Sequence, residues 1–415
     1  MLSEDESCEG VAPLLASLEL LDLSETVADE TICGWLTLTR PDLLTHLREL
    51  GVNRLKDRQL IANGLGKWRR QPVLSAIKQF ESAPVVVSST YGLGNQLRVL
   101  LSYRAAAVAQ RRPLVLVWEK MTACNARFSE LFEPIEGCVV IESLSDLDLV
   151  RPGLSRLPRG IFPSTYYTHH AVHNKPLETS MWEVLKPISS IRAAVDANLA
   201  RLGDSFVAVH VRRTDHMTSE CGKIERMRAA GEWTSEDDFD AFLEQHGECA
   251  IYLATDNAAT QGAFLVRYGS RIQCCTPIEP PPPDAGEVFR HTPLWQAVVD
   301  IFTCAAARAF MGTYYSSFSD AIQRLRLARG RHSTEDRHRL APPPWDPVLL
   351  GQTRDVSVAL DEPALLALLE GMEKHGHELS KAHSEWVAGG WGGELMATMP
   401  DEWIPTGALT RGAPT

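Results

Sequence analysis

Two arginines, a histidine and an aspartate stand together where one predicted strand ends. The apolar run Phe206-Val-Ala-Val209 leads directly into His210-Val-Arg212-Arg213-Thr-Asp215. Ligands of open α/β sheets collect beyond the carboxyl ends of the strands. A guanidinium group suits a diphosphate there, because its donors match phosphate oxygens and its charge persists at any working pH. The stretch therefore predicts a phosphate site, with a structural Arg–Asp ion pair as the alternative.

A glycine loop precedes a predicted helix. Gly92 and Gly94 allow the backbone to turn tightly and to approach a ligand closely. Asn95 can hydrogen-bond within the loop or to a ligand hydroxyl. The loop is not GxGxxG, and it lacks the lysine of a P-loop. It is either a structural turn or one wall of a ligand site.

Two further loops place polar side chains after predicted strands. Asp256 follows one strand, where its carboxylate can accept two hydrogens from a guanine edge or cap the next helix. Ser316, Ser317 and Phe318 precede another helix. Hydroxyl and backbone donors at a helix start suit an anion, but serine is also a routine N-cap. Ligand binding and capping both stay open for these loops.

Taken in order, these four segments resemble the GDP-fucose-dependent fucosyltransferase superfamily, which includes the α1,2-, α1,6- and protein O-fucosyltransferases. The similarity spans residues 84 to 330. Gly92-Leu-Gly-Asn-Gln-Leu97 is similar to the α1,2 type, although Arg98 stands where that type usually has phenylalanine. His210-Val-Arg-Arg-Thr-Asp215 is closer to the α1,6 type. The resemblance implies a GT-B fold, with two Rossmann-like doubly wound domains facing a cleft.

The resemblance also implies roles in donor binding. Arg212 or Arg213 holds the diphosphate and stabilises charge as GDP leaves, and His210 lines the same pocket. The remaining implied contacts are a guanine contact from Asp256, a phosphate cradle from Ser316, Ser317 and Phe318, and donor contacts from Gly94 and Asn95 on the opposite domain.

The implied catalytic base is Glu220. It follows Asp215 by five positions, as an acidic residue does in the α1,6 type, but its neighbours Cys221 and Gly222 depart from that type. Fucosyl transfer passes through an oxocarbenium-like state, so the protein must neutralise the departing diphosphate and activate the acceptor hydroxyl. Arginines can meet the first need without a metal, and a carboxylate such as Glu220 can meet the second.

Hydrophobic periodicity predicts strands that alternate with helices in two blocks. Neighbouring strand residues point to opposite faces, so of the two arginines we expect Arg212 to be the essential contact to the diphosphate. The expected strands are 85–88, 114–118, 206–211, 250–254 and 309–312. The expected helices are 96–109, 294–309, 318–328 and 362–379.

The amino-terminal part has a different pattern. Residues 31–72 carry apolar side chains at helical spacing, with Gly51 as a helix stop. The segment from Leu43 to Leu65 resembles the latter half of a sterile alpha motif domain, and an unrelated helical hairpin is the alternative. The predicted organisation is a tail (1–30), a helical domain (31–75), two Rossmann-like domains (82–200 and 201–345) and a C-terminal extension (346–415).

Charge and composition exclude some classes of function. The 415 residues include 41 basic and 53 acidic side chains, a net charge of -12. This balance argues against a general nucleic-acid or acidic-membrane binder. The amino terminus is acidic, and Glu19, Asp22 and Glu25 interrupt the apolar stretch after it. We therefore expect no signal peptide or membrane span, a cytoplasmic location and mostly reduced thiols among nine cysteines.

The sequence thus predicts an inverting glycosyltransferase that moves fucose from GDP-fucose to a hydroxyl of a glycan or protein. We expect no metal or other cofactor. A transferase for another nucleotide-sugar is one alternative, and a non-catalytic GDP-sugar sensor or scaffold is another. The helical domain is a candidate for self-association or for binding a protein partner.

Overall fold

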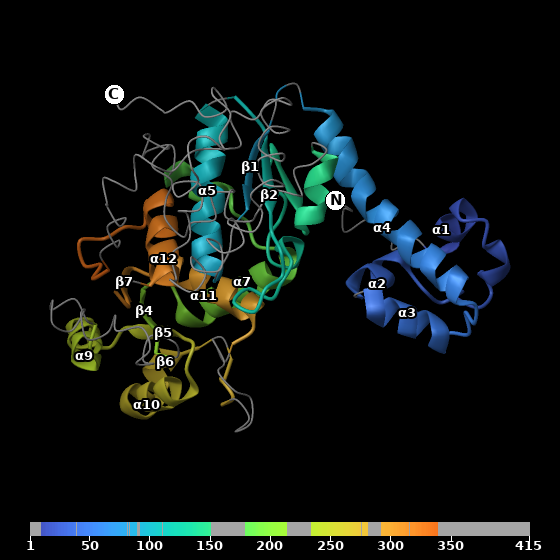
Figure 1. The fold of residues 1–415 in the computed structure, drawn as a ribbon. Coiled ribbons are helices and arrows are strands. Elements are labelled where there is room, and N and C mark those ends of the chain that lie inside the picture. The colour runs from blue at the N-terminus through green and yellow to red at the C-terminus, as the bar shows by residue number, and fades with distance from the viewer. Residues whose placement is uncertain are drawn as a thin grey trace, which may run out of the picture. The chain divides into compact units, whose positions relative to one another are not determined.

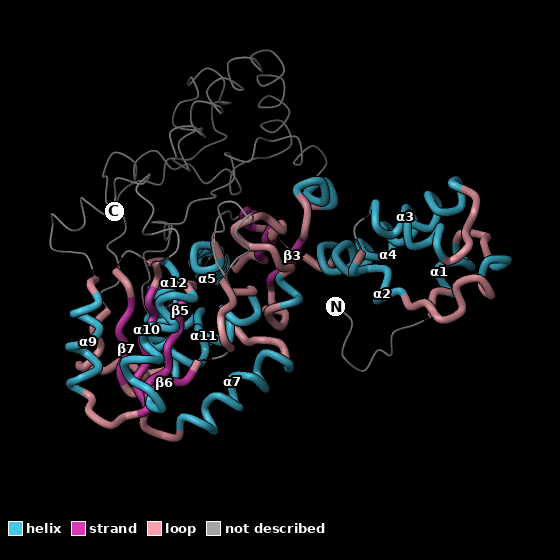
Figure 2. Tube along the Cα trace, turned by 90° about the horizontal axis from the view of Figure 1, so that it is seen from below, coloured by secondary structure: helices cyan, strands magenta, loops and turns pink. Residues whose placement is uncertain are grey.

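The structure is a computed structural model that describes most of the chain between residues 10 and 338 (Figure 1). The described ranges are 10–38, 40–80, 82, 84–88, 92–109, 111–150, 179–213, 234–274, 276–280, 292–314 and 316–338. Asp215, Glu220, the expected helix 362–379 and the C-terminal extension lie outside them. The chain divides into a helical unit and an α/β unit. Within the described ranges, strands occur only in the α/β unit (Figure 2).

The helical unit has one buried core. Its elements are α1 (Ala12–Ser17), η1 (Leu21–Leu23), α2 (Ile32–Thr37), α3 (Arg40–Glu49) and α4 (Leu55–Lys78). Leu15 of α1 is buried in the same core as Trp35 and Leu47, so the core begins before residue 31, where the expected domain starts. Residues 146–150 also belong to this unit.

Gly51 ends a helix as predicted. Its φ of +99° is a left-handed conformation that suits glycine, and α3 stops two residues earlier at Glu49. The resemblance to a sterile alpha motif domain stays a prediction.

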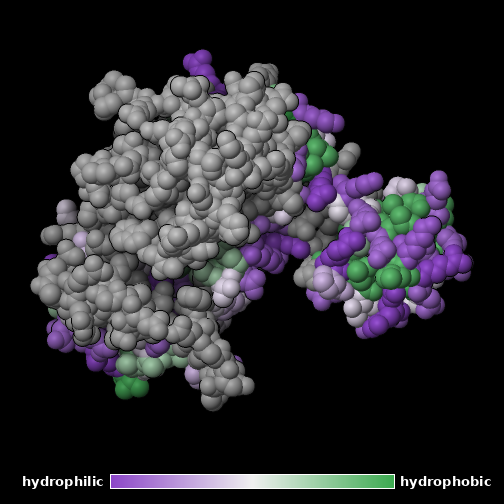
Figure 3. Space-filling model, in the orientation of Figure 1, coloured by the Kyte–Doolittle hydropathy of each residue, from purple (hydrophilic) through white to green (hydrophobic). Residues whose placement is uncertain are grey.

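The helical unit exposes two large apolar side chains, Leu21 and Leu55. Its visible face mixes hydrophobic and hydrophilic residues (Figure 3).

The α/β unit begins with a three-stranded parallel sheet. β1 (Val85–Ser88) pairs with β2 (Leu114–Val117), which pairs with β3 (Cys138–Ile141). The crossover from β1 to β2 is α5 (Leu93–Ala109). This βαβ unit confirms the prediction, except that the helix begins at Leu93 rather than at residue 96. The carbonyl of Gly92 accepts from the amides of Asn95 and Gln96, so the glycine loop itself forms the first turn.

A second parallel sheet has the strand order β6-β5-β4-β7. Its strands are β4 (Phe206–Val211), β5 (Ala250–Thr255), β6 (Ile272–Gln273) and β7 (Ala309–Gly312). The helices of this half are α7 (Ser189–Leu202), α9 (Glu236–Gln245), α10 (Ala258–Tyr268), α11 (Leu294–Ala306) and α12 (Ser317–Ala328). The 3-10 helix η8 (Gly269–Arg271) precedes β6. The other short 3-10 helices are η2 (Phe128–Glu130), η3 (Leu144–Leu149) and η6 (Trp182–Val184). α11 ends before residue 309, because Ala307 is already extended (ψ 153°) and leads into β7.

Helices cover both faces of the second sheet. Ala208 and Tyr252 face a core shared with α11 and α12, whereas Val209 and Leu253 face a core shared with α9 and α10. Buried residues on both faces explain why these strands read as continuous apolar runs. The prediction of an α/β fold with two parallel sheets is confirmed. No helix among the described residues is long and apolar enough to cross a membrane.

A buried arginine joins the end of α11 to the chain beyond α12. The side chain of Arg326 is fully buried and donates to the carbonyl oxygens of Ala307 and Arg308. It also donates to the Asp336 carboxylate at 2.8 Å. It donates as well to the carbonyl oxygens of Cys304 and Ala305, in the last turn of α11, where carbonyl groups lack the amide partners of the helix interior. Together these bonds fix the segment that leads into β7.

Candidate functional site

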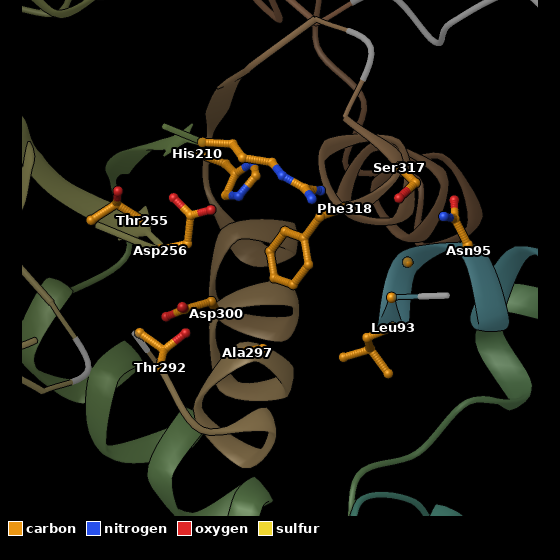
Figure 4. Close-up of a pocket in the computed structure, with 13 residues that line it drawn as sticks. Leu93, Asn95, His210, Thr255, Asp256, Thr292, Ala297, Asp300, Ser317 and Phe318 are labelled. Carbon is orange, nitrogen blue, oxygen red and sulfur yellow. The ribbon is translucent and has the colours of Figure 1, made fainter. Parts of the chain in front are cut away.

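A pocket opens where the strands of the second sheet end. Its lining comes from the ends of β4 and β5, from α11, and from the first turns of α5 and α12. Asp256, Asp300 and Thr292 lie on one side, and Ser317, Asn95 and Leu93 lie on the other, with Phe318 between them (Figure 4). The full lining is Gly92, Leu93, Gly94, Asn95, His210, Arg212, Thr255, Asp256, Thr292, Ala297, Asp300, Ser317 and Phe318.

The two arginines after β4 have different surroundings. Arg212 lines the pocket, and its backbone amide donates to the Thr313 hydroxyl at 2.9 Å. Arg213 is buried outside the lining, where its guanidinium donates to the carbonyl oxygen of Thr234 and lies 5.8 Å from the ring centre of Phe239. Of the pair, Arg212 is therefore placed to meet a ligand, and Arg213 packs against the start of α9.

His210 is held by α12. Its Nδ1 lies 2.7 Å from the Ser319 hydroxyl, and its ring centre lies 4.6 Å from that of Phe318. Its partner in β7, Gly312, would place a Cβ atom 2.6 Å from the Cβ of Ser319. The glycine is required there, because a side chain would push α12 away from β7 and so disturb the contact between Ser319 and His210.

Asp256 and Asn257 divide the roles that the sequence left open. Asn257 caps α10, where its side chain accepts the amide of Thr260 at 2.9 Å. Asp256 lines the pocket, and its Oδ1 accepts the backbone amide of Arg213 at 3.0 Å. The cap function thus falls to Asn257, which leaves the Asp256 carboxylate at the end of β5 beside the pocket.

The serines before α12 also divide their roles. Ser316 is fully buried and caps α12 by accepting the amide of Ser319, and it is absent from the pocket lining. Ser317 and Phe318 line the pocket from the first turn of the helix. The start of α12 therefore faces the pocket, and the positive end of its dipole favours an anion there.

Gly94 lies against the backbone of α12. A Cβ atom on Gly94 would lie 2.6 Å from the carbonyl oxygen of Ser317 and 2.8 Å from the amide nitrogen of Phe318. Only glycine allows this approach without a shift of one helix. The first turns of α5 and α12 are consequently brought together at one wall of the pocket.

An ion pair holds the same two helices together. Arg98 of α5 donates to Oδ2 of Asp320 at 3.0 Å, and the two side chains are 11% and 2% exposed. The other carboxylate oxygen, Oδ1, lies 2.8 Å from Nε2 of His338. Arg98, which departs from the α1,2 pattern, is therefore the partner of an acidic residue on α12.

Asp300 is a pocket residue that the sequence analysis missed. It lies in α11, is 5% exposed and accepts a hydrogen bond from the Tyr252 hydroxyl at 2.6 Å. Burial raises the pKa of Asp300 to about 7, and the hydrogen bond from Tyr252 acts in the opposite direction. The available signal was a lone charged residue within the otherwise uncharged and mostly apolar run from Leu294 to Ala306.

Most of the predicted site residues thus meet in one pocket. Arg213 and Ser316 lie beside it in supporting positions. Asp215 and Glu220 lie outside the described residues. Within the described residues, no group of three or more histidine, cysteine, aspartate or glutamate side chains could hold a metal ion. The predicted residues that line the pocket are Gly92, Gly94, Asn95, His210, Arg212, Asp256, Ser317 and Phe318.

Neither a protein-family model nor a curated protein sequence matches the chain. Fucosyltransferase NodZ from Bradyrhizobium is a similar solved structure, with 18% identity, a TM-score of 0.37 and coverage of 59% of this chain and 93% of that chain. POFUT1 in complex with GDP-fucose is 14% identical with a TM-score of 0.39, and the alignment covers 62% of this chain and 98% of that chain.

Replacement of Gly94 by alanine tests the close approach of α5 and α12. We expect Gly94→Ala to lower the free energy of unfolding by about 1–3 kcal/mol, because the added methyl group meets backbone rather than a flexible side chain. Gly262→Ala is the matched control, since Gly262 lies in α10 with open space around it; it should stabilise by roughly 0.5–1 kcal/mol. Urea unfolding compares the two, and equal stabilisation by both would contradict the assignment.

The raised pKa of Asp300 predicts a pH-dependent stability difference. The folded state favours the protonated carboxyl of Asp300. The contribution of this protonated group to the free energy of unfolding is therefore complete below pH 4 and is lost as the pH rises to about 7. Asp300→Asn stays neutral, so its stability relative to the parent should improve by about 1–4 kcal/mol between pH 4 and pH 8. Urea unfolding measures this change, with Asp204→Asn at an exposed position as the control substitution. A constant difference for Asp300→Asn would refute a raised pKa.

Proposed function

We propose that the protein is an inverting glycosyltransferase that uses GDP-fucose as donor and a hydroxyl of a glycan or protein as acceptor, with no requirement for a metal. The observation that carries the proposal is the division of charge within one pocket. Arg212 and the first turns of α5 and α12 favour an anion, while Asp256 and Asp300 supply carboxylates. A nucleoside diphosphate has the complementary division, with a charged diphosphate and a base edge that donates hydrogen bonds.

The diphosphate suits the wall formed by α12. Its negative charge is stabilised by the guanidinium of Arg212 and by the amide groups at the start of the helix near Ser317. A second helix start, at Gly94 of α5, adds to the same field because the two helices approach closely there. The two helix starts are fixed by this approach before the ligand arrives, so they and Arg212 stabilise the charge that grows on the diphosphate as it departs.

The base suits the carboxylate side. A guanine edge offers two adjacent N–H donors to one carboxylate, whereas uracil offers one, so paired donors favour guanine. We assign this contact to Asp300, because it is the more deeply set carboxylate and stands with Ala297 on α11 and near Thr292. Asp256, to which the family resemblance gives the guanine, then lies at the strand ends, where it accepts the backbone amide of Arg213, the residue after Arg212.

The transfer itself needs one bond to form as another breaks. The bond between the anomeric carbon of fucose and the diphosphate oxygen breaks, and its electron pair stays on GDP. The acceptor oxygen attacks the opposite face of the sugar and loses its proton to a base, which gives inversion. Arg212 neutralises the leaving group in this scheme. Glu220 remains the proposed base on the strength of its spacing from Asp215.

Replacement of Arg212 tests the diphosphate assignment. Arg212→Ala should weaken GDP binding by about 10- to 100-fold, because it removes a charged hydrogen-bond donor, and transfer from GDP-fucose should fall to background. Isothermal titration with GDP, UDP and their sugars measures the first effect, and release of GDP in the presence of acceptors measures the second.

Arg337→Ala is the matched control for this test. Arg337 is an exposed arginine of the same unit whose guanidinium donates to Gln245, and its loss should leave both readouts unchanged. Near-normal turnover by Arg212→Ala would end the proposed role of this residue. Tight binding of UDP without binding of GDP would end the choice of donor, and full binding without turnover over a broad acceptor panel would favour a sensor.

A further inference from the structure

A chain of buried hydrogen bonds leads from α7 to the pocket carboxylate Asp300. The Tyr252 hydroxyl of β5 donates to Oδ1 of Asp300 at 2.6 Å. The Asn198 side-chain amide of α7 donates to the Tyr252 oxygen at 3.3 Å. Tyr252 is fully buried and Asn198 is 3% exposed, so water does not compete for these bonds.

The direction of each hydrogen bond in this chain is determined. Arg201 donates to Oδ1 of Asn198, and a guanidinium can only donate, so the amide nitrogen of Asn198 must point the other way. That nitrogen is a donor as well, so the Tyr252 oxygen accepts from it. The Tyr252 hydrogen is consequently directed at Asp300. A hydrogen bond donated to a carboxyl oxygen stabilises the ionised form.

We propose that Tyr252 is a positioning residue for the donor site, which orients Asp300 and favours its ionised form so that the carboxylate accepts hydrogen bonds from the nucleotide base. This inference rests on the proposed function. Tyr252 itself does not line the pocket. It acts through Asp300, which is the member of the chain that the ligand reaches.

Other groups around Asp300 act on its charge. Burial raises the pKa of the thiols of Cys274, after β6, and Cys304, in α11, and the nearby charge of Asp300 raises it further, so both are uncharged neighbours. The pocket is also lined by His210 of β4, by Arg212 just after β4, and by Asp256 just after β5 on the same side as Asp300. Burial raises the pKa of Asp300 to about 7, and the Tyr252 bond limits that rise.

The inference predicts a pH-dependent affinity. An ionised Asp300 accepts the base donors, so GDP affinity should be full above the pKa of Asp300 and should fall as the pH falls through it. Tyr252→Phe removes the hydroxyl but keeps the ring, so the pKa should rise and the midpoint of the affinity curve should move upward by about one pH unit or more. Asn198→Ala, which removes the amide behind the hydroxyl, should move it in the same direction by less.

Isothermal titration with GDP from pH 5.5 to pH 8.5 tests the proposal. Tyr268→Phe is the matched control, because the Tyr268 hydroxyl donates to Asp240 and not to a pocket residue; its midpoint should equal that of the parent protein. A uniform loss of affinity at every pH in Tyr252→Phe, with the midpoint unmoved, would show a merely structural role and overturn the proposal.

A second readout separates this inference from the proposed function. If the parent protein binds no GDP at any pH, the proposed donor is wrong, whatever Tyr252 does. The difference between the parent protein and Asp300→Asn in the pH dependence of urea unfolding then reports the pKa of Asp300. Tyr252→Phe should move that dependence to higher pH, and the effect should vanish when Asp300→Asn is also present. An unmoved dependence would overturn the positioning role without any reference to GDP.

Discussion

The close approach of α5 and α12 is the constraint on which the pocket depends. Gly94 lies so near the backbone of Ser317 that a single methyl group does not fit between them. The Arg98–Asp320 ion pair ties the same helices together one turn further along. One helix follows β1 and the other follows β7, so this contact joins the two sheets. Without it, the two helix starts would not share a wall and their dipoles would not add at one point.

The two sides of the pocket carry groups of opposite charge. Groups with fixed positive character, Arg212 and the helix starts, suit a ligand whose charge increases during the reaction. The other side carries the buried carboxyl of Asp300, which burial disfavours as an anion and which a donated hydrogen bond favours. Both effects on the Asp300 carboxyl are strong, because the protein interior screens charge poorly. The cost of burying Asp300 is offset in part by the hydrogen-bonded side chains behind it.

Much of the fold was predictable because it follows from local patterns. Apolar runs gave β1, β4 and β7 with their observed bounds, since both faces of a parallel strand are buried. Alternation along β4 indicated that Arg212 and Arg213 point to opposite faces and favoured Arg212 for the pocket, but the packing of Arg213 against α9 could not be derived. The early start of α5 was missed because a glycine loop usually reads as a break in structure.

Contacts between distant residues explain what the sequence did not reveal. Arg98 appeared only as a departure from a pattern, because its partner Asp320 lies 222 residues away. Asp300 was hidden in an apolar helix, and its value as a ligand group depends on Tyr252 and Asn198, which come from other elements. Local periodicity carries no information about such pairs. The roles of Ser316 and Ser317 differ for a similar reason, since one faces the core and the other faces the pocket.

The central claim is that this pocket holds a guanine nucleotide with its diphosphate between Arg212 and the start of α12. A crystal structure of the protein with GDP tests this most directly. The account predicts diphosphate density within hydrogen-bond distance of the Arg212 guanidinium and of the amides near Ser317, with the base against Asp300. GDP bound elsewhere, or bound here with the base at Arg212 and the diphosphate beside the carboxylates, would contradict it.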